Sequence, residues 1–248
     1  MSFANMKNPK YSIIVVHYQG TVSHDIFMRG MESIKNIDSD DYEVLVYHDG
    51  PLIDLDVIKE SPYPVKPTDV RYNDFGHSLR DIGIREAKGE YIIHTNADNV
   101  FYPNLIKGLN SALDIAQLCK ISIQRDIEYD PDIPSDQKIV EIRKYEALFS
   151  DNIIVYPIYL MGVHCMGAAV MTLRDFKPGD PVVKSLMTGY PAVPYCIDAM
   201  QLVMRRDVWL SYGGWYDKDR DSDGTMYRRF VREHRATYAT EPLGEHWP

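Results

Sequence analysis

The chain has 248 residues, of which 45% are hydrophobic and 25% are charged, and its formal net charge is −9. This length and composition are ordinary for a soluble globular protein with one large domain or two small ones. The acidic balance argues against nucleic acid or an anionic membrane surface as the main partner, because both need a basic face. It leaves room for an anionic small ligand, since a divalent cation can bridge carboxylates to phosphate.

Cysteine use and the N-terminal residues bear on the compartment. Three cysteines, Cys119, Cys165 and Cys196, are too few and too scattered for a disulfide framework or a zinc ribbon. A reducing, cytoplasmic location is therefore the simpler expectation. Residues 1–10 contain no apolar core of a signal peptide, and no run of about 18 apolar residues predicts a transmembrane helix. The oligomeric state has no signature in the sequence.

Strands and helices are predicted to alternate over residues 11–120. Residues 11–18 form a continuous β-branched run, as in a strand buried on both faces. Residues 23–37 carry apolar side chains at helical spacing after Ser23, an expected N-cap. Further strands are predicted at residues 42–50, 70–74 and 90–96, and further helices at residues 78–89 and 103–117. This order predicts an α/β fold with a parallel sheet, right-handed crossovers and helices on both faces.

The second half of the sequence is less regular. Residues 125–138 are charged and contain prolines, which predicts a surface excursion, and residues 177–195 have the prolines and glycines of a long loop. Order returns after residue 196 with a predicted strand, a short helix and a Gly-Gly turn. A last helix is predicted at residues 224–235, with Met226 and Phe230 facing inward.

Polar side chains follow three of the predicted strands at the point where each strand ends. They are His17 to Gln19, His48 and Asp49, and Asn96 to Asn99. In a parallel sheet, ligands bind at the carboxyl ends of the strands. Asp98 is a carboxylate of the kind that a hard divalent cation prefers. An ordinary turn, with Asp98 capping the next helix, explains the same residues, so this pattern alone leaves both interpretations open.

Four segments, in order, resemble motifs of the inverting glycosyltransferases of family 2, which have the GT-A fold. "SIIVVHYQ" and "EVLVYHDGP" resemble the family's first two strands, and "LRDIGIREAKGEYIIHTNAD" resembles the stretch that ends in its Asp-x-Asp signature. "GGWYDKDRDSDGTMYRRF" resembles the later Gly-Gly-Phe-Asp segment with its Glu-Asp pair and following arginine. Several positions depart from the pattern, among them His48 and Asn96, which stand where the family has aspartates, and Ser222, where it has a glutamate.

The resemblance implies a single GT-A domain over residues 1–248, an α/β fold with a Rossmann-like, mostly parallel sheet flanked by helices. Residues 11–120 would bind the nucleotide sugar, and residues 121–248 would form an irregular acceptor and catalytic half. The implied function is metal-dependent, inverting transfer of a sugar from a nucleotide-diphospho-sugar to a glycan or another hydroxyl acceptor. The nucleotide is expected to be UDP, the commonest one in the family.

The resemblance also implies a donor and metal site. Asp98 would hold a divalent cation, Mn²⁺ or Mg²⁺, which stabilises the leaving diphosphate. His246 would be a second ligand, and an imidazole favours Mn²⁺. The residues expected to bind the donor are His17, Tyr18, Asp49, Arg80, Asp81, Asn96, Ala97 and Asp98. Ordinary roles compete with some of these: a turn for Asp49, a helix surface for Arg80 and an exposed tail for His246.

On the acceptor side, Asp223 is the expected base that takes the proton from the attacking hydroxyl, with Asp221 as the alternative. Both lie in an acidic stretch that is also typical of a solvated loop, and the spacing to Met226 and Arg229 favours Asp223. Trp215 is expected to stack on an acceptor sugar, with core packing as the alternative.

Two other classes of function compete with sugar transfer. A sugar nucleotidyltransferase shares the fold, but it needs a glycine-rich, basic loop after the first strand to hold a triphosphate. Residues 17–25 contain one glycine and no lysine or arginine, which counts against it. A non-catalytic module that binds a nucleotide sugar or a glycan would explain Asn96 as a sign of decay. The presence of both Asp98 and Asp223 favours an enzyme instead.

Overall fold

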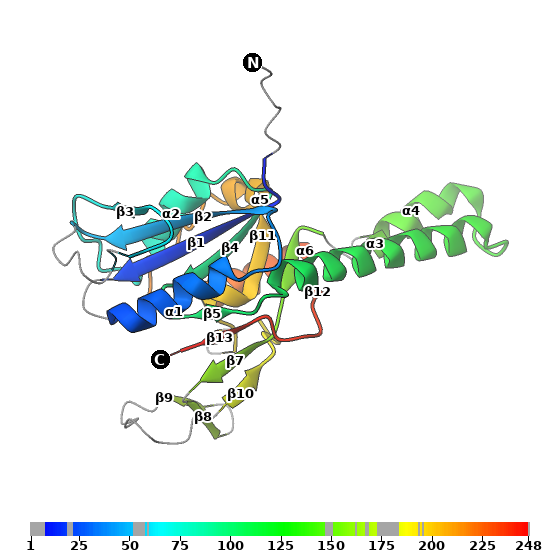
Figure 1. Ribbon diagram of the computed structural model, residues 1–248. Coiled ribbons are helices and arrows are strands. Elements are labelled where there is room, and N and C mark those ends of the chain that lie inside the picture. Colours follow the sequence, from blue (N-terminus) through cyan, green and yellow to red (C-terminus); the bar gives the residue numbers. More distant parts are fainter. Residues whose placement is uncertain are drawn as a thin grey trace, which may run out of the picture.

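A seven-stranded mixed sheet forms the centre of the computed structural model (Figure 1). The structure describes residues 8–18, 22–51, 58, 60–146, 151–161, 163–166, 169–172, 184–192, 194 and 196–247. The strand order is β12-β6-β11-β4-β1-β2-β3. Four parallel strands come from the first half: β1 (Tyr11–Tyr18), β2 (Tyr42–Asp49), β3 (Val65–Pro67) and β4 (Tyr91–Asn96). The second half adds β6 (Ile153–Val155), β11 (Leu202–Arg205) and β12 (Thr237–Tyr238), and β11 is antiparallel to β4 and β6.

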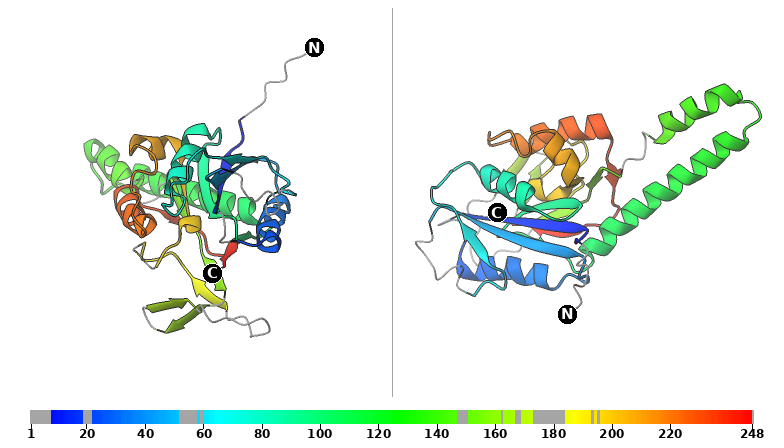
Figure 2. Two further views of the ribbon diagram at one scale, coloured as in Figure 1. Left: turned by 90° about the vertical axis from the view of Figure 1, so that its left-hand side faces the viewer. Right: turned by 90° about the horizontal axis from the view of Figure 1, so that it is seen from above.

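Helices cover both faces of this sheet (Figure 2). One face carries α1 (His24–Lys35) and the start of α3 (Leu105–Tyr129), and the other carries α2 (His77–Glu86), α5 (Arg206–Ser211) and α6 (Ser222–His234). Side chains alternate along β1, so that Ile13 and Val15 pack with α1 and α3, whereas Ile14 and Val16 pack with α2, α5 and α6. All four side chains are fully buried, which confirms the predicted α/β architecture.

A smaller four-stranded sheet lies beside the central one, in the order β10-β7-β13-β5 (Figure 1). Its strands are β5 (Val100–Phe101), β7 (Ile158–Met161), β10 (Lys184–Met187) and β13 (Gly244–His246). A separate ribbon pairs β8 (Val163–Met166) with β9 (Ala169–Thr172). Because β5 follows β4 closely in the chain, the pairing of β13 with β5 brings residues 244–247 next to the turn at residues 97–99.

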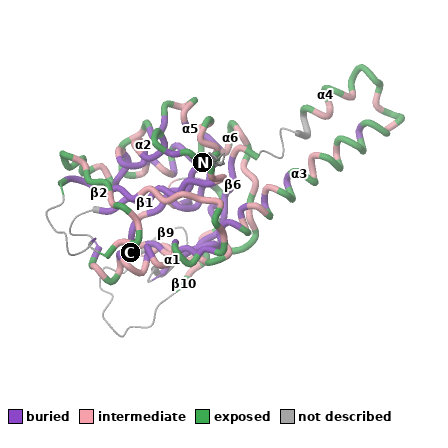
Figure 3. The backbone as a smooth tube through the Cα atoms, turned by 45° about the horizontal axis from the view of Figure 1, so that its top comes forward, coloured by how far each residue is buried: buried purple, intermediate pink, exposed green. Residues whose placement is uncertain are grey.

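A helical arm replaces the surface excursion that was predicted at residues 125–138. The helix α3 continues to Tyr129, beyond its predicted end at residue 117, and α4 (Ser135–Glu146) returns along it. The two helices project from the body of the molecule (Figure 2), and most of the arm is exposed or half-buried (Figure 3). The predicted loop is thus limited to residues 130–134, which contain both prolines, and the charged residues on either side lie on the two helices.

The strand predicted at residues 70–74 and the loop predicted at residues 177–195 both differ from the structure. The elements predicted after residue 196 are confirmed. The third strand lies at β3 and not at residues 70–74, where the amides of Tyr72 and Asn73 bind a carboxylate instead of a neighbouring strand. The predicted long loop at residues 177–195 includes β10, which pairs with β7. The predicted strand, short helix and last helix after residue 196 are present as β11, α5 and α6. In the part of the chain that is described, no helix is long and apolar enough to span a membrane.

The helix α1 packs directly on the turn after β4 because Gly30 has no side chain. A Cβ at this position would lie 2.3 Å from the carbonyl oxygen of Ala97. Gly30→Ala is therefore expected to lower the free energy of unfolding by about 1–3 kcal/mol through overpacking, as measured by urea denaturation. Gly108→Ala on α3 is the control, since its Cβ would meet only the flexible side chain of Leu243. An equal cost at both positions would contradict this explanation.

Candidate active site

The turn after β4 places Asp98 at the carboxyl end of the central sheet. Ala97 is buried, and its amide donates to the carbonyl of Val16 at 3.0 Å, which fixes the turn against β1. The Oδ1 atom of Asp98 is buried and has no hydrogen-bond partner among the described residues. Burial raises the pKa of Asp98, and the imidazole of His246 opposes this rise. A bound cation would account for the unpaired carboxylate oxygen.

Three carboxylates and one imidazole gather at this end of the sheet; we call them the carboxylate cluster. Asp98 lies on the turn, Asp198 precedes the short helix η1 (Ala199–Gln201), Asp223 is in the first turn of α6, and His246 is on β13. The Nδ1 atom of His246 lies 3.4 Å from Oδ2 of Asp198, an ion pair without hydrogen-bond geometry. Burial alone would lower the pKa of His246, but the charges of Asp198, Asp98 and Asp223 raise it to about 9. The imidazole is therefore cationic at neutral pH in the absence of a metal.

Asp223 is the member of the cluster that α6 carries. Burial and the neighbouring charge of Asp198 raise the pKa of Asp223 to about 6. Gly224 lets α6 approach this close, because a Cβ there would lie 2.4 Å from the Cα atom of Pro194. Asp221 precedes the helix and acts on Asp223 by raising its pKa further. The assignment of the base to Asp223, with Asp221 as the alternative, stays a prediction.

Asp198 is a cluster residue that sequence reasoning missed. Its Oδ1 atom accepts a hydrogen bond from the amide of Met200 at 2.9 Å, and its own amide donates to Oε1 of Gln201 at 2.9 Å. Burial would raise the pKa of Asp198, but His246 and the bond from Met200 hold it at about 2. The only signal in the sequence is the Asp-x-x-Gln spacing of a capping box, and that spacing predicts a helix start rather than a functional site.

Arg80 is buried, with 2% of its surface exposed, so the alternative of an arginine on a helix surface is wrong. Its Nη2 atom donates to Oδ1 of Asn96 at 2.6 Å, and Nη1 donates to the carbonyl of Phe75 at 2.7 Å. The guanidinium also lies 5.1 Å from the centre of the Trp215 ring. Asn96 thus has a charged partner inside the protein at the position where the resembled motif has an aspartate.

The carboxylate of Asp49 holds the loop that precedes α2. Its Oδ1 atom accepts from the amide of Tyr72 at 2.8 Å, and Oδ2 accepts from the amide of Asn73 at 3.1 Å. Asn73 and Phe75 in this loop have left-handed φ angles of 53° and 58°, which are costly for a bulky residue such as Phe75. Asp49 and Arg80 together fix this conformation. The expected contact of Asp49 with the donor stays a prediction.

Trp215 and Asp81 have structural contacts in place of the predicted ones. The Trp215 ring is fully buried and stacks at 5.4 Å on both His77 and Trp209. The expected stacking on an acceptor sugar is therefore wrong, because neither face of the ring is accessible. The amide of Trp215 donates to Oδ1 of Asp81 at 3.0 Å, and Asp81 also forms an ion pair with Arg85. These bonds anchor the Gly-Gly turn and give no support to a donor contact for Asp81.

His17 and His48 form a buried pair at the ends of β1 and β2. Their Nδ1 atoms are 2.9 Å apart, so one ring donates a hydrogen bond and the other accepts it. Burial and the neighbouring His48 lower the pKa of His17 to about 4, which keeps that ring neutral at pH 7. Tyr18 is paired with Asp49 in the sheet, but its side chain lies outside the described residues. Donor contacts of His17 and Tyr18 stay predictions.

The donor set at Asp98 suits a cation that is shared with a ligand. In the described ranges, no three His, Cys, Asp or Glu side chains are arranged to hold a metal ion by themselves. A hard cation that binds a nucleotide takes only one or two protein carboxylates and completes its shell with phosphate oxygens and water. Asp98, with its unpaired buried oxygen, and His246 beside it fit that smaller requirement.

The ion pair between His246 and Asp198 makes stability depend on pH. The pKa of His246 is about 9 in the fold, whereas an unperturbed histidine has a pKa of about 6.5. The pair therefore stabilises the fold fully below pH of about 6.5, and this contribution is lost as pH rises through about 9. In chelator-treated protein, urea denaturation should show a loss of roughly 3 kcal/mol over that range. Asp198→Asn keeps the bond from Met200 and should flatten the profile; an unchanged slope would contradict the pairing.

Comparison with known proteins identifies the family. Residues 12–151 match the model of glycosyl transferase family 2. The fold is similar to that of S. aureus TarS 1-349, with a TM-score of 0.59 and 11% identity over 96% of this chain and 60% of that one. It is also similar to the mannosyltransferase PcManGT from Pyrobaculum calidifontis, with a TM-score of 0.51 and 11% identity over 97% of this chain and 57% of that one. No curated protein matches the sequence.

The solved structures and the family model support different conclusions, because they differ in sequence identity and in the share of the chain that they match. This chain spans about three fifths of the two solved structures, and at 11% identity they bear on the fold alone. The family match covers more than half of the chain and includes three of the four segments that carry the resemblance. The chain belongs to glycosyl transferase family 2, so the expected glycosyltransferase family and its GT-A fold are confirmed.

Proposed function

We propose that this protein transfers a sugar from a nucleoside-diphosphate sugar to a hydroxyl acceptor, at the carboxylate cluster. The feature that carries the proposal is that Asp98, whose buried Oδ1 atom has no partner among the described residues, and Asp223, from a distant segment of the chain, both lie near the imidazole of His246. Sugar transfer needs two kinds of carboxylate, one that holds a cation against the leaving phosphates and one that accepts a proton. Family membership supplies the reaction class that these two groups would serve.

The donor side of the proposal rests on Asp98 and His246. One solved TarS structure contains UDP and another contains UDP-GlcNAc, while PcManGT was solved with GDP-Man and Mn²⁺. For this chain we propose a UDP-sugar and a divalent cation held by Asp98 and His246, with Mn²⁺ preferred because of the imidazole. Such a cation, when bound, neutralises the charge that develops on the leaving diphosphate. His246 must lose its proton to act as a ligand, so cation binding should release a proton.

The acceptor side rests on Asp223. With a pKa of about 6, this carboxylate is ionised at pH 7 and remains basic enough to take a proton from a hydroxyl. In the proposed step, the acceptor oxygen forms the bond to the anomeric carbon and its proton passes to Asp223. The bond from that carbon to the phosphate oxygen breaks, and the electron pair leaves with the diphosphate. Attack from the side opposite the leaving group inverts the anomeric carbon.

The two halves of the chain would divide these tasks. We propose that residues 11–120 bind the donor, because this part provides the parallel strands and the turn with Asp98. Residues 121–248 would bind the acceptor and complete the chemistry, because they provide Asp198, Asp223 and His246. With Trp215 buried, the acceptor must be recognised by other side chains of this half.

A donor screen tests the proposal directly. The protein is incubated with UDP-, GDP- and dTDP-sugars and Mn²⁺, and release of the nucleoside diphosphate is measured together with the change in melting temperature. We expect a UDP-sugar to be hydrolysed slowly and UDP with Mn²⁺ to raise the melting temperature, since a ligand that binds only the fold stabilises it. Binding without turnover in the presence of any acceptor would indicate a non-catalytic module. No thermal shift with any nucleoside diphosphate would overturn the donor site.

A further inference from the structure

Residues 244–247 form a short strap that carries His246 to the carboxylate cluster. The strand β13 lies between β5 and β7, with Glu245 paired to Val100 on one side and to Tyr159 on the other. Gly244 allows the close approach to β5, because a Cβ there would lie 2.6 Å from the carbonyl oxygen of Val100. The backbone of the strap is thus held by two strands, and one of them follows directly on the turn with Asp98.

Arg29 on α1 joins this strap to the turn. Its guanidinium carbon lies 3.9 Å from the centre of the Trp247 ring, and its Nη2 atom donates to the carbonyl of Asp98 at 3.1 Å. The amide of Trp247 in turn donates to Oδ1 of Asn99 at 3.2 Å. Arg29 therefore contacts Trp247, which directly follows the proposed ligand His246, and the backbone of Asp98, the other proposed ligand. Burial lowers the pKa of Arg29 below its ordinary value, and the charge of Asp98 opposes this lowering.

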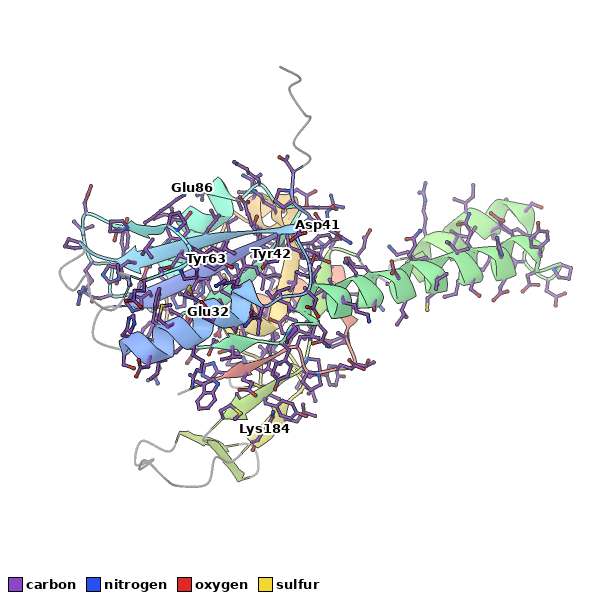
Figure 4. All side chains as sticks on the ribbon, viewed as in Figure 1. Glu32, Asp41, Tyr42, Tyr63, Glu86 and Lys184 are labelled. Atoms are coloured by element: carbon purple, nitrogen blue, oxygen red, sulfur yellow. The ribbon has the colours of Figure 1, made fainter. Side chains whose placement is uncertain are left out.

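The outer side of the strap is also fixed. Lys184 on β10, labelled in Figure 4, forms an ion pair with Glu245 at 3.2 Å. The other carboxylate oxygen of Glu245 accepts from Nε1 of Trp247 at 3.1 Å, which sets the orientation of the indole under Arg29. The backbone N–H and the Nε1–H of Trp247 thus both donate hydrogen bonds, and these two bonds hold the ring in place.

We propose that Arg29 and Trp247 form a latch that fixes His246 relative to Asp98 and thereby sets the affinity of the site for a nucleoside diphosphate with its cation. Arg29 is a positioning residue in this proposal, which rests on the proposed function. The planar guanidinium is suited to the task because it can stack on an indole and donate a directed hydrogen bond at the same time. A lysine keeps the charge but cannot do both, so the latch predicts a specific loss in Arg29→Lys.

The test measures binding of UDP with Mn²⁺ by calorimetry to wild type, Arg29→Lys, Trp247→Phe and Trp247→Ala. Loss of groups that orient metal ligands typically weakens affinity by about 10–100-fold. We expect a loss of about that size in Arg29→Lys and Trp247→Ala, and a smaller loss in Trp247→Phe, which keeps an aromatic ring for the arginine but lacks the bond to Glu245. Arg205→Gln is the matched control, because it removes an arginine ion pair at the amino end of β4, away from the site.

Tryptophan emission gives a second readout that does not depend on activity. Trp247 directly follows the proposed ligand His246, whereas Trp209 and Trp215 are fully buried in the core, so the emission change on adding UDP and Mn²⁺ should be smaller in Trp247→Phe. Equal affinity of wild type, Arg29→Lys and Trp247→Ala would overturn the latch while leaving the proposed function standing. Failure of wild type to bind any nucleoside diphosphate would overturn both. Melting temperatures of the free variants separate a local loss of binding from unfolding.

Discussion

Asp223→Asn is expected to lower kcat for sugar transfer by about 10²–10⁴-fold, the usual contribution of a positioned general base. Asparagine has nearly the same size as aspartate and can still accept the bond that the Gly224 amide donates at 2.7 Å. It cannot take a proton from the acceptor. Binding of the donor and the cation should persist, because the proposal assigns these to Asp98 and His246 and not to α6. A large loss of kcat with unchanged donor affinity is the expected signature.

The pH dependence of the rate makes this test specific. In wild type, kcat/KM should fall as pH drops through about 6, because burial and the charge of Asp198 raise the pKa of Asp223 to about that value. The Asp223→Asn variant should lose this acidic limb together with the rate. Asp221→Asn distinguishes the alternative base: it should keep the rate and move the limb to lower pH, since Asp221 raises the pKa of its neighbour. Loss of turnover in Asp221→Asn and its retention in Asp223→Asn would reverse the assignment.

The parts of the fold that the sequence predicts are those in which a local pattern and the final packing agree. The run at Tyr11–Tyr18 is apolar on both faces, and the structure buries both faces between layers of helices. The helix over His24–Lys35 has a Ser23 cap and buries Phe27, Met31 and Ile34, as its spacing predicts. Parallel pairing then follows from the order of elements, which places the polar strand ends on one edge of the sheet.

The errors lie where tertiary contacts override local signals. Residues 70–74 look like a strand, but the Asp49 carboxylate takes the amides that a neighbouring strand would need. The arm of α3 and α4 is helical although its charges and prolines suggested a loop, because Pro131 and Pro134 fall in the short turn between the helices and interrupt neither of them. Trp215 follows the glycine pair of the segment that resembles Gly-Gly-Phe-Asp, and only its complete burial against His77 and Trp209 shows that it belongs to the core.

The candidate site could be predicted in part for the same reason. Asp98 and Asp223 stand at fixed places in the resembled motifs, whereas Asp198 has only the spacing of a capping box and joins the site through its ion pair with His246 across the fold. Arg80 shows a second limit of local patterns, because a helix sequence does not reveal that its guanidinium binds Asn96 on a neighbouring strand. Asn96 therefore need not indicate decay: an amide oxygen serves Arg80, and the charge that a cation requires remains on Asp98.

Asp98→Ala is expected to abolish most of the thermal stabilisation by UDP and Mn²⁺. A ligand at 100 times its dissociation constant stabilises a fold by about 2.7 kcal/mol. For a domain of this size, each kcal/mol raises the melting temperature by about 2–4 °C, so wild type should gain roughly 5–10 °C. The variant should gain little, because the remaining ligand, His246, is held as a cation by Asp198 and Asp223 and repels a metal ion.

The melting temperature of the free Asp98→Ala variant should stay near that of wild type or rise. Burial and the charge of Asp198 both raise the pKa of Asp98, which means that its ionised form is a cost to the empty fold. The same carboxylate is thus unfavourable without a cation and necessary with one, as expected of a residue retained for binding rather than stability. Asp98→Asn separates charge from shape and should behave like the alanine variant. A full thermal shift with UDP and Mn²⁺ in either variant would place the cation elsewhere.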